Sequence, residues 1–351
     1  MSKPLITALI DTYNHERYIE QAVLSVLQQD FSPADLEVLV IDDGSSDKTP
    51  EILRKFGSRI RYLRKENGGQ ASAFNAAIPE AHGEVVAFLD GDDWWAKAKL
   101  SAVLEAFEDD PLLGVVGHGY YEVTTDGLIR ESVLPEKAFR IELGDAEGVR
   151  LFDALQTFLG TSRLAVRASL LQDVLPVPNE LVFSADRFIY TLAVSVARAV
   201  LLDKPLCYYR VHDENLFRTE DSARLRRSQE MQSLVTEKLY PQLCAREIRH
   251  DIVDALLEPH RLLAKRVRLS CDGGMPWETF QVEREAYRRS HTDGGLADSA
   301  FRALVLGLTL LMPPKRFYGL KRWYWDKRVG RYRGKSYPGT DARIRRQSVS
   351  T

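Results

Sequence analysis

The stretch VVAFLDGDDWW, residues 85–95, decides the fold of this chain. An apolar run ends in three acids within four positions, Asp90, Asp92 and Asp93, and two tryptophans follow at once. A short apolar run bounded by polar residues predicts a buried strand, so the acids mark the end of that strand. Two such charges about 4 Å apart repel by about 4 kcal/mol at an effective dielectric of about 20. The sequence therefore indicates a bound cation among them, since a cation removes that repulsion.

Three earlier segments repeat this pattern of a buried strand followed by polar residues. Apolar runs at residues 5–10, 36–41 and 60–64 predict strands, and segments with helical periodicity follow them. Strands that alternate with helices predict an α/β fold with a mainly parallel sheet and helices on both faces. Ligands bind at the carboxyl ends of the strands in such sheets, so we expect four strand ends to converge on one cleft. The polar residues at these ends are Asp11, Thr12, Tyr13, Asp42, Asp43, Asn67, Gly68, Gly69 and Asp90 to Asp93.

The chemistry of these side chains predicts a divalent cation and a diphosphate. Oxygen ligands favour Mg²⁺ or Mn²⁺, and such ions take one or two carboxylates and leave other positions to phosphate oxygens. A nucleoside diphosphate is therefore the expected ligand. The sequence has no Walker loop and no GxGxxG after a strand, which argues against P-loop and dinucleotide sites. Taken singly, an Asp or Asn at a strand end is also an ordinary turn former.

The charge of this 351-residue chain is unevenly distributed. The net charge is −2, yet residues 302–351 hold 13 Lys and Arg against two acids, which predicts a basic segment that meets an anionic partner. Residues 301–335 alternate apolar anchors with cations and include Trp and Tyr, which favours a peripheral membrane or interaction surface. A helix packed on the main body with its charges in water is the alternative. Nucleic-acid binding is not expected, since no recognised module is visible.

The remaining features predict a cytoplasmic protein that can associate with the cytoplasmic face of a membrane. The three cysteines lie far apart, with no disulfide framework or metal-ligand spacing. The first residues, MSKPLITALI, are typical of a strand, and we expect no signal peptide. The longest apolar stretch, residues 303–312, has about half of the ~20 residues that a membrane-spanning helix needs.

Four blocks of sequence together resemble the nucleotide-binding half of family 2 glycosyltransferases, which have the GT-A fold. The blocks are LITALIDTYNHERYIEQAVLSVLQQD, VLVIDDGSSDKT, KENGGQASAFNAAI and GEVVAFLDGDDWW, in the family's order and spacing over residues 5–100. The resemblance continues less closely to about residue 215. It implies a metal-dependent, inverting enzyme that moves a sugar from a nucleotide-diphosphate sugar, expected to be a UDP-sugar. The implied acceptor is a hydroxyl of a glycan, such as an envelope polysaccharide, or of a lipid-linked precursor.

The resemblance also suggests how the chain is divided. We expect a glycosyltransferase domain at residues 1–218, with its nucleotide-binding half at 1–110 and its acceptor half at 111–218. Beyond it the sequence pattern is helical, which predicts a helical extension at residues 219–300. The basic segment at 301–335 and a disordered tail at 336–351 follow.

The resemblance further implies roles for residues at the predicted cleft. Asp92 of the DxD signature would bind Mn²⁺ or Mg²⁺, and His212 would approach the metal or the diphosphate. Asp43 would accept a hydrogen bond from the base. The residues that would contact the nucleotide are Asp11, Thr12, Tyr13, Asp43, Asn67, Gly68, Gly69, Asp90 and Gly91. Those expected at the sugar or acceptor pocket are Asp93, Trp94 and Trp95, although the tryptophans can instead pack on the helix that follows.

Asp186 is the candidate catalytic base. It matches the aspartate of the family's ED-like motif at a helix start, although Ala185 stands where the family often has glutamate. The alternative for Asp186 is a cap of the helix that begins near Arg187. Two rival functions remain open at this stage. One is an inactive family member that acts as a scaffold in a membrane-associated glycan assembly complex, and the other is a nucleotidyltransferase on a related fold.

Overall fold

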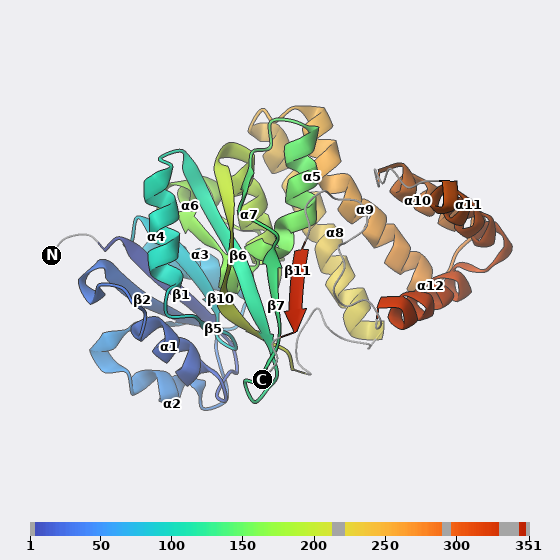
Figure 1. Ribbon diagram of the computed structural model, residues 1–351. Helices are drawn as coiled ribbons and strands as arrows, with labels where there is room; N and C mark the ends of the chain where they lie inside the picture. Colours follow the sequence, from blue (N-terminus) through green and yellow to red (C-terminus); the bar gives the residue numbers. More distant parts are fainter. Residues whose placement is uncertain (1–3, 213–221, 290–295, 330–343, 349–351) are drawn as a thin grey trace.

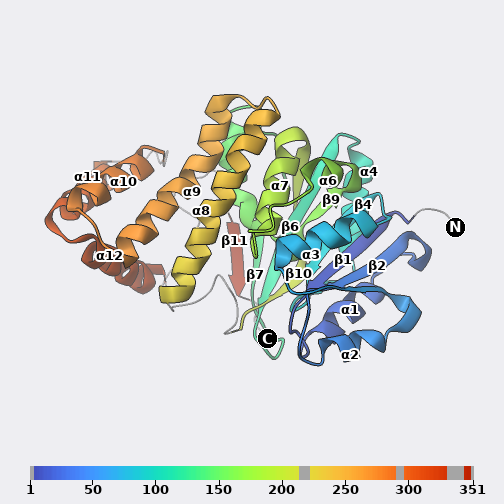
Figure 2. The ribbon, with the colours of Figure 1, turned by 180° about the vertical axis from the view of Figure 1, so that it is seen from behind.

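The computed structural model describes residues 4–212, 222–289, 296–329 and 344–348. A central sheet is covered by helices on both faces, with α4 in front of it in Figure 1 and α3 and α7 in front of it in Figure 2. A group of helices from the C-terminal part of the chain extends from one side of this layered body (Figure 1). This is the mainly parallel α/β architecture typical of the GT-A fold, with a helical C-terminal region.

Residues 4–110, where the sequence predicts the nucleotide-binding half, are built on four parallel strands in the order β3-β2-β1-β4. Leu9, Leu39 and Val86, on three of these strands, are fully buried, which explains why the strands read as nearly continuous apolar runs. The strands are β1 (Ile6–Thr12), β2 (Leu36–Asp42), β3 (Arg61–Arg64) and β4 (Val85–Asp90). The helices are α1 (Ile19–Leu27), α2 (Thr49–Arg54), α3 (Gln70–Ala77) and α4 (Lys99–Asp109).

The segment from residue 111 onward, predicted as the acceptor half, adds strands of both directions to the same sheet. Strand β9 (Ala165–Arg167) joins antiparallel to β4 and to β6 (Leu113–Val123). Strand β10 (Arg198–Arg210) runs parallel to β6 with register shifts on both sides of Pro205, where the sequence had suggested two short strands. The remaining elements are β5 (Trp94–Trp95), β7 (Ile129–Pro135), β8 (Phe139–Ile141), α5 (Ala146–Leu155), α6 (Ala168–Val174) and α7 (Ala185–Val196).

The C-terminal helices have a small apolar core of their own. It is formed by Leu262, Leu269, Val282, Phe317 and Tyr318, from α9, α10 and α12. The helices are α8 (Ser222–Ala245), α9 (His250–Cys271), α10 (Pro276–Arg289), α11 (Leu296–Leu311) and α12 (Pro314–Val329). The expected domain boundary near residue 218 lies outside the described residues.

One correction concerns the chain end. Residues 336–351 were expected to be disordered, but Ile344–Ser348 form strand β11, which pairs antiparallel with β7. The edge of β7 offers backbone hydrogen-bonding groups, so a polar segment pairs there without an apolar pattern of its own. Residues 336–343 and 349–351 lie outside the described part of the chain.

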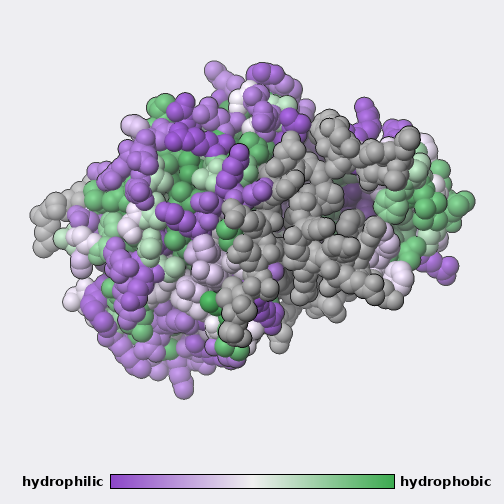
Figure 3. Space-filling model, viewed as in Figure 1, coloured by the Kyte–Doolittle hydropathy of each residue, from purple (hydrophilic) through white to green (hydrophobic). Residues whose placement is uncertain are grey.

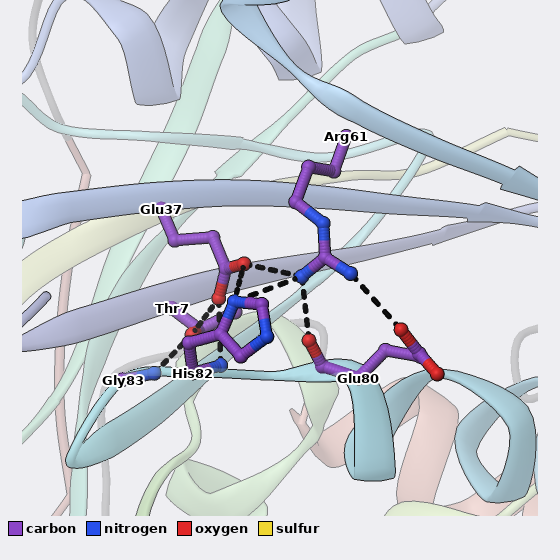
Figure 4. A network of polar contacts seen from close by, with 6 residues as sticks. All are labelled: Thr7, Glu37, Arg61, Glu80, His82 and Gly83. Atoms are coloured by element: carbon purple, nitrogen blue, oxygen red, sulfur yellow. Dashed lines mark hydrogen bonds and ion pairs between the residues drawn. The ribbon is translucent and has the colours of Figure 1, made fainter. Parts of the chain in front are cut away.

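A partly exposed ionic network closes the amino edge of the parallel strands (Figure 4). Glu37 of β2 accepts hydrogen bonds from Thr7 of β1 at 2.6 Å and from the backbone N–H of His82 at 2.8 Å, and pairs with Arg61 of β3. The Thr7 hydroxyl in turn accepts from the Gly83 N–H. Burial opposes ionisation of Glu37, yet these hydrogen bonds lower its pKa. One carboxylate thus links β1, β2, β3 and the turn before β4.

Replacing Glu37 with alanine should destabilise the fold by about 1–3 kcal/mol, because it leaves the buried Thr7 hydroxyl without its acceptor and the partly exposed Arg61 without its ion pair. Urea unfolding measures the loss, and Glu108→Ala, which removes an exposed acid of α4, is the matched control. Ligand binding at the opposite, carboxyl edge should be unchanged. Equal stability of the two variants would contradict the role given to the network.

Candidate active site

The carboxyl ends of the parallel strands meet at one edge of the sheet, as the sequence predicts. In the strand register Asp11 of β1 lies beside Asp90 of β4, and Thr12 lies beside Asp42 of β2. The Gly91 N–H donates to the Asp11 carbonyl at 2.9 Å, which extends the alignment past the strands. A Cβ on Gly91 would lie 2.6 Å from the Thr12 hydroxyl, so this close approach needs glycine.

Six carboxylates interact electrostatically at this edge: those of Asp11, Asp43, Asp90, Asp92, Asp93 and Asp186. Burial, followed by the charges of Asp92 and Asp186, raises the pKa of Asp11 to about 8. Burial and the Asp11 and Asp92 charges raise the pKa of Asp90 well above its usual range. Oδ1 of Asp11 is buried and finds no hydrogen-bond partner among the described residues. The cluster therefore carries more negative charge than these neighbours compensate.

Asp92 is the member of this cluster that its surroundings hold in the ionised form. His212 Nε2 lies 3.0 Å from Asp92 Oδ2. Burial opposes ionisation, but the His212 hydrogen bond and the charges of His15 and His212 lower the pKa of Asp92. The structure thus brings together the two residues, 120 positions apart, that the sequence assigned to a metal.

Arg210 fixes the loop that carries the acids. Its Nε donates to the Asp92 carbonyl at 2.9 Å, and its backbone N–H donates to Asp93 Oδ1 at 2.8 Å. Its Nη2 donates to the Gln21 side chain at 2.6 Å. Asp93 is 2% exposed, and burial and the Asp92 charge raise its pKa to about 7. The geometry therefore favours a supporting role for Asp93 over the pocket role expected from the sequence.

The two tryptophans of β5 have different surroundings. The Trp94 ring stacks on Tyr208 with centroids 4.9 Å apart and remains partly exposed. Trp95 is 3% exposed, and its Nε1 donates to the Ser162 carbonyl at 3.1 Å. The Lys99 amine lies 3.7 Å from the centroid of the Trp95 ring. Burial places Trp95 in the core against Lys99 of α4, in line with the packing alternative and not the pocket position, whereas Trp94 stays partly exposed.

Asp43 organises the turn that follows β3. Its carboxylate accepts from the backbone N–H groups of Gly68 at 3.0 Å and Gly69 at 2.6 Å, and from the Lys65 amine at 2.7 Å. Gly69 has φ +83°, and a Cβ there would lie 2.6 Å from the Val182 backbone. These bonds use three of about four acceptor positions on the carboxylate, so the base contact predicted for Asp43 has one position left.

Three other residues expected near the nucleotide differ in exposure. Tyr13 is 46% exposed, and Asn67 is exposed at the tip of its turn. Thr12 is buried, with its hydroxyl 3.1 Å from His15 Nδ1. Tyr13 and Asn67 are thus available to a ligand in the present conformation, whereas Thr12 supports the loop after β1.

Asp186 lies in the first turn of α7 and interacts electrostatically with Asp11 and Asp90. Thr161 donates to Asp186 Oδ2 through its backbone N–H at 3.0 Å and its hydroxyl at 3.2 Å. Burial raises the pKa of Asp186, although the backbone N–H groups of Arg187 and Thr161 oppose this. The residue at the cap position is Ser184, so Asp186 is not the helix cap that the sequence left as an alternative.

Sequence reasoning missed the residues that hold Asp90 and Asp186 in place. The Ser162 hydroxyl accepts from the Asp90 N–H at 3.1 Å, and the Ser162 carbonyl accepts from the buried Lys99 amine at 2.9 Å. Gln70 connects Thr161 to the Ala185 N–H. Residues 161–163 form a short 3₁₀ helix beneath the acids. No charge or spacing pattern marks these uncharged side chains, so sequence alone gave no signal for them.

The residues present fit a divalent cation. In the parts of the chain that the structure describes, no group of three or more His, Cys, Asp or Glu side chains is arranged to hold a metal. Mg²⁺ and Mn²⁺ sites that also use phosphate oxygens and water need only one or two protein ligands. The unpartnered Asp11 oxygen and the raised pKa values of Asp11 and Asp90 show a local excess of negative charge that such an ion would offset.

The structure resembles solved glycosyltransferases. TarS of S. aureus, residues 1–349 in complex with UDP-GlcNAc, superposes with a TM-score of 0.57 at 21% identity, over 80% of this chain and 78% of that one. A mannosyltransferase from Pyrobaculum calidifontis, solved with GDP-Man and Mn²⁺, gives a TM-score of 0.52 at 20% identity, over 92% and 85% of the two chains. At such identities the likeness concerns the fold.

The sequence comparisons identify the family. An uncharacterised glycosyltransferase of Nostoc sp. is 32% identical over 225 residues, which cover 60% of this chain and 66% of that protein. EpsJ of Bacillus subtilis, also an uncharacterised glycosyltransferase, is 30% identical over 61% of this chain and 63% of its own length. The chain thus spans slightly less than two thirds of these relatives. Residues 7–170 match the family Glycosyl transferase family 2, and this domain of the chain belongs to that family.

Proposed function

We propose that the chain is an inverting glycosyltransferase that moves a sugar from a nucleotide-diphosphate sugar to a hydroxyl of a glycan or lipid-linked acceptor. The observation that carries the proposal is the convergence of Asp11, Asp90, Asp92 and Asp186 at the carboxyl ends of β1 and β4 and the start of α7. A donor and an acceptor bound at this edge would meet between the acids of the nucleotide half and Asp186.

The donor would bind through the strand ends of the nucleotide half. We assign the base to the edge formed by Tyr13, the remaining acceptor position of Asp43 and the turn at Asn67, and the ribose to Asp90. Asp92 and His212 would hold Mn²⁺ or Mg²⁺, which when bound stabilises the negative charge of the leaving diphosphate. The relatives solved with UDP-GlcNAc and with GDP-Man support a nucleotide-sugar donor, and we propose UDP as the nucleotide.

Asp186 would act as the base that takes the proton of the acceptor hydroxyl. Its raised pKa suits this task, because a general base is most effective when its pKa lies near the working pH. Thr161 and Arg187 donate three hydrogen bonds to the carboxylate, which fixes its orientation and leaves one acceptor position for the substrate. Direct attack opposite the leaving group would invert the anomeric carbon.

The two rival functions are less well supported. A scaffold without activity has no need of the electrostatic interaction between Asp186 and Asp11, which costs stability. A nucleotidyltransferase would need a basic phosphate loop near the N-terminus, whereas β1 ends in Asp11 and Thr12 and the loop after it begins with Tyr13. The proposal therefore keeps sugar transfer as the activity of this site.

The charge cluster predicts a pH-dependent stability. Because the pKa of Asp11 is about 8 in the fold and its ordinary value is 3.8, the folded chain binds this proton more tightly than the unfolded chain. The associated stabilisation is present below about pH 4 and is lost as pH rises through about 8. With chelator present, Asp11→Asn should therefore melt higher than wild type at about pH 9, and this advantage should shrink near about pH 5. Asp109→Asn, at an exposed acid, is the control, and a pH-independent difference would refute the charge argument.

Asp92→Ala should abolish the metal-dependent part of UDP binding. The melting temperature measured with UDP- and GDP-sugars, each with and without Mn²⁺, reports binding, since a ligand stabilises the fold by RT ln(1 + [L]/Kd). Wild type should show an added shift with Mn²⁺ and a UDP-sugar, and the variant should not. An undiminished Mn²⁺-dependent shift in the variant would remove Asp92 from the site, and a larger shift with GDP-sugars would reassign the nucleotide.

Asp186→Ala should keep donor binding and lose transfer by about 100-fold or more, the usual contribution of a general base. Release of UDP in the presence of a panel of glycan and lipid-linked acceptors measures transfer, and the thermal shift with donor measures binding. Thr161→Val, which removes one hydrogen bond to the same carboxylate, should have a smaller effect. Transfer at the wild-type rate by Asp186→Ala would show that another group is the base.

A further inference from the structure

Helix α11 has an apolar face that no described part of the chain covers. Its outward positions from residue 300 to 311 recur at helical spacing, and none of them is charged or polar, although the exposed Ser299 lies just before them. Leu304 is 61% exposed, Leu310 45% and Leu311 81%. The other exposed positions of this stripe are Ala300, Ala303 and Gly307. Figure 3 shows hydrophobic residues gathered at the end of the molecule that α11 forms in Figure 1.

The opposite face of α11 is also apolar and packs inside the molecule. Val305, Leu308 and Met312 contact the small core of the C-terminal helices. A helix that is apolar on both faces is normally buried on both, so the outward face indicates a surface with a partner. The sequence left open whether this segment packs on the body or meets a membrane, and the structure shows packing for the inner face alone.

The charges beside this face indicate what the partner is. Lys315 and Arg316 begin α12 directly after the turn that ends α11, and both are exposed. Between Asp298 and Asp326 the sequence holds five Lys and Arg and no acid, and of these Lys321 pairs with Glu283 within the C-terminal helices. An apolar face bordered by cations is complementary to an anionic bilayer, where acyl chains take the apolar side chains and headgroups take the cations.

Two other arrangements fit less well. In a symmetric dimer of this chain the outward face of α11 would contact the same face of the second copy. Lys315 and Arg316 of the two copies would then repel each other across the interface. Helix α11 is too short to span a membrane, because its 16 residues reach about 24 Å and the hydrocarbon core is ~30 Å thick. No helix in the described residues has the length and apolar character needed to cross a bilayer.

We propose that the outward face of α11, residues 300–311, together with Lys315 and Arg316, docks the chain on the surface of an anionic lipid bilayer. The helix lies along the interface with Leu304 and Leu311 among the upper acyl chains. Figures 1 and 2 both place α11 at the far end of the molecule from the parallel strands, so docking leaves the site edge uncovered.

Flotation of the full chain with vesicles tests the proposal without any nucleotide, so the result does not depend on the proposed activity. The probes are vesicles of phosphatidylcholine alone and of phosphatidylcholine mixed with phosphatidylglycerol. The wild-type chain should bind the mixed vesicles more tightly, and added salt should weaken that binding. Lys315→Gln with Arg316→Gln should weaken binding to mixed vesicles by about 30-fold. Leu304→Ser with Leu311→Ser should weaken it by about 10-fold or more.

Matched controls replace similar side chains elsewhere on the surface. Leu112→Ser removes a leucine that is 65% exposed, and Arg54→Gln with Lys55→Gln removes two adjacent exposed cations at the end of α2. Both controls should bind as wild type does, and all variants should keep the wild-type melting temperature. Absence of binding to mixed vesicles, or equal losses in variants and controls, overturns the proposal. So does a dimer in size-exclusion chromatography that only the leucine pair disrupts.

Discussion

Repulsion between buried carboxylates is the constraint on which the rest of this structure depends. The parallel register of β1 and β4 sets Asp11 beside Asp90, and neither can move away without disturbing the sheet. Unpaired charges in a partly buried place cost stability, and here the cost appears as the raised pKa values of both groups. This electrostatic repulsion lies at the edge where the donor is proposed to bind, so a cation bound with the donor would also neutralise the charge.

The sheet tolerates this repulsion because its parallel strands are stabilised by the apolar core and by contacts at their opposite ends. Their apolar side chains fill the core, and the Glu37 network ties three of them together at the opposite edge (Figure 4). In that network every carboxylate oxygen of Glu37 has donors and its pKa falls, whereas at the carboxyl edge Asp11 keeps an unpartnered oxygen and its pKa rises. Acids at the two ends of one sheet thus have opposite electrostatic situations, which separates the structural end from the end that can accept a ligand.

The parts that could be predicted from sequence are those with a strong local pattern. Apolar runs followed by polar residues predicted the four parallel strands and their shared edge, because neighbouring residues in the sequence determine both the burial of a strand and the place where it ends. Local sequence patterns do not predict elements whose position depends on packing against residues distant in the sequence. Strand β10 continues through Pro205 by shifting its register against β6, and β11 depends on the free edge of β7. Trp95 could not be assigned to the core, since its burial depends on Lys99 and Ser162.

The contact between the two halves of the domain explains why so many uncharged groups surround the acids. Gln70, at the start of α3, accepts from the Ala185 N–H and donates to Thr161, and Thr161 donates to Asp186. The turn at Gly69 packs against Val182, so the loop that follows the third strand also supports the loop before α7. A shift of the turn at the nucleotide end would therefore be transmitted to the proposed base through hydrogen bonds of ordinary length. Such a connection offers a physical route by which donor binding could position Asp186, and it requires no movement of the sheet itself.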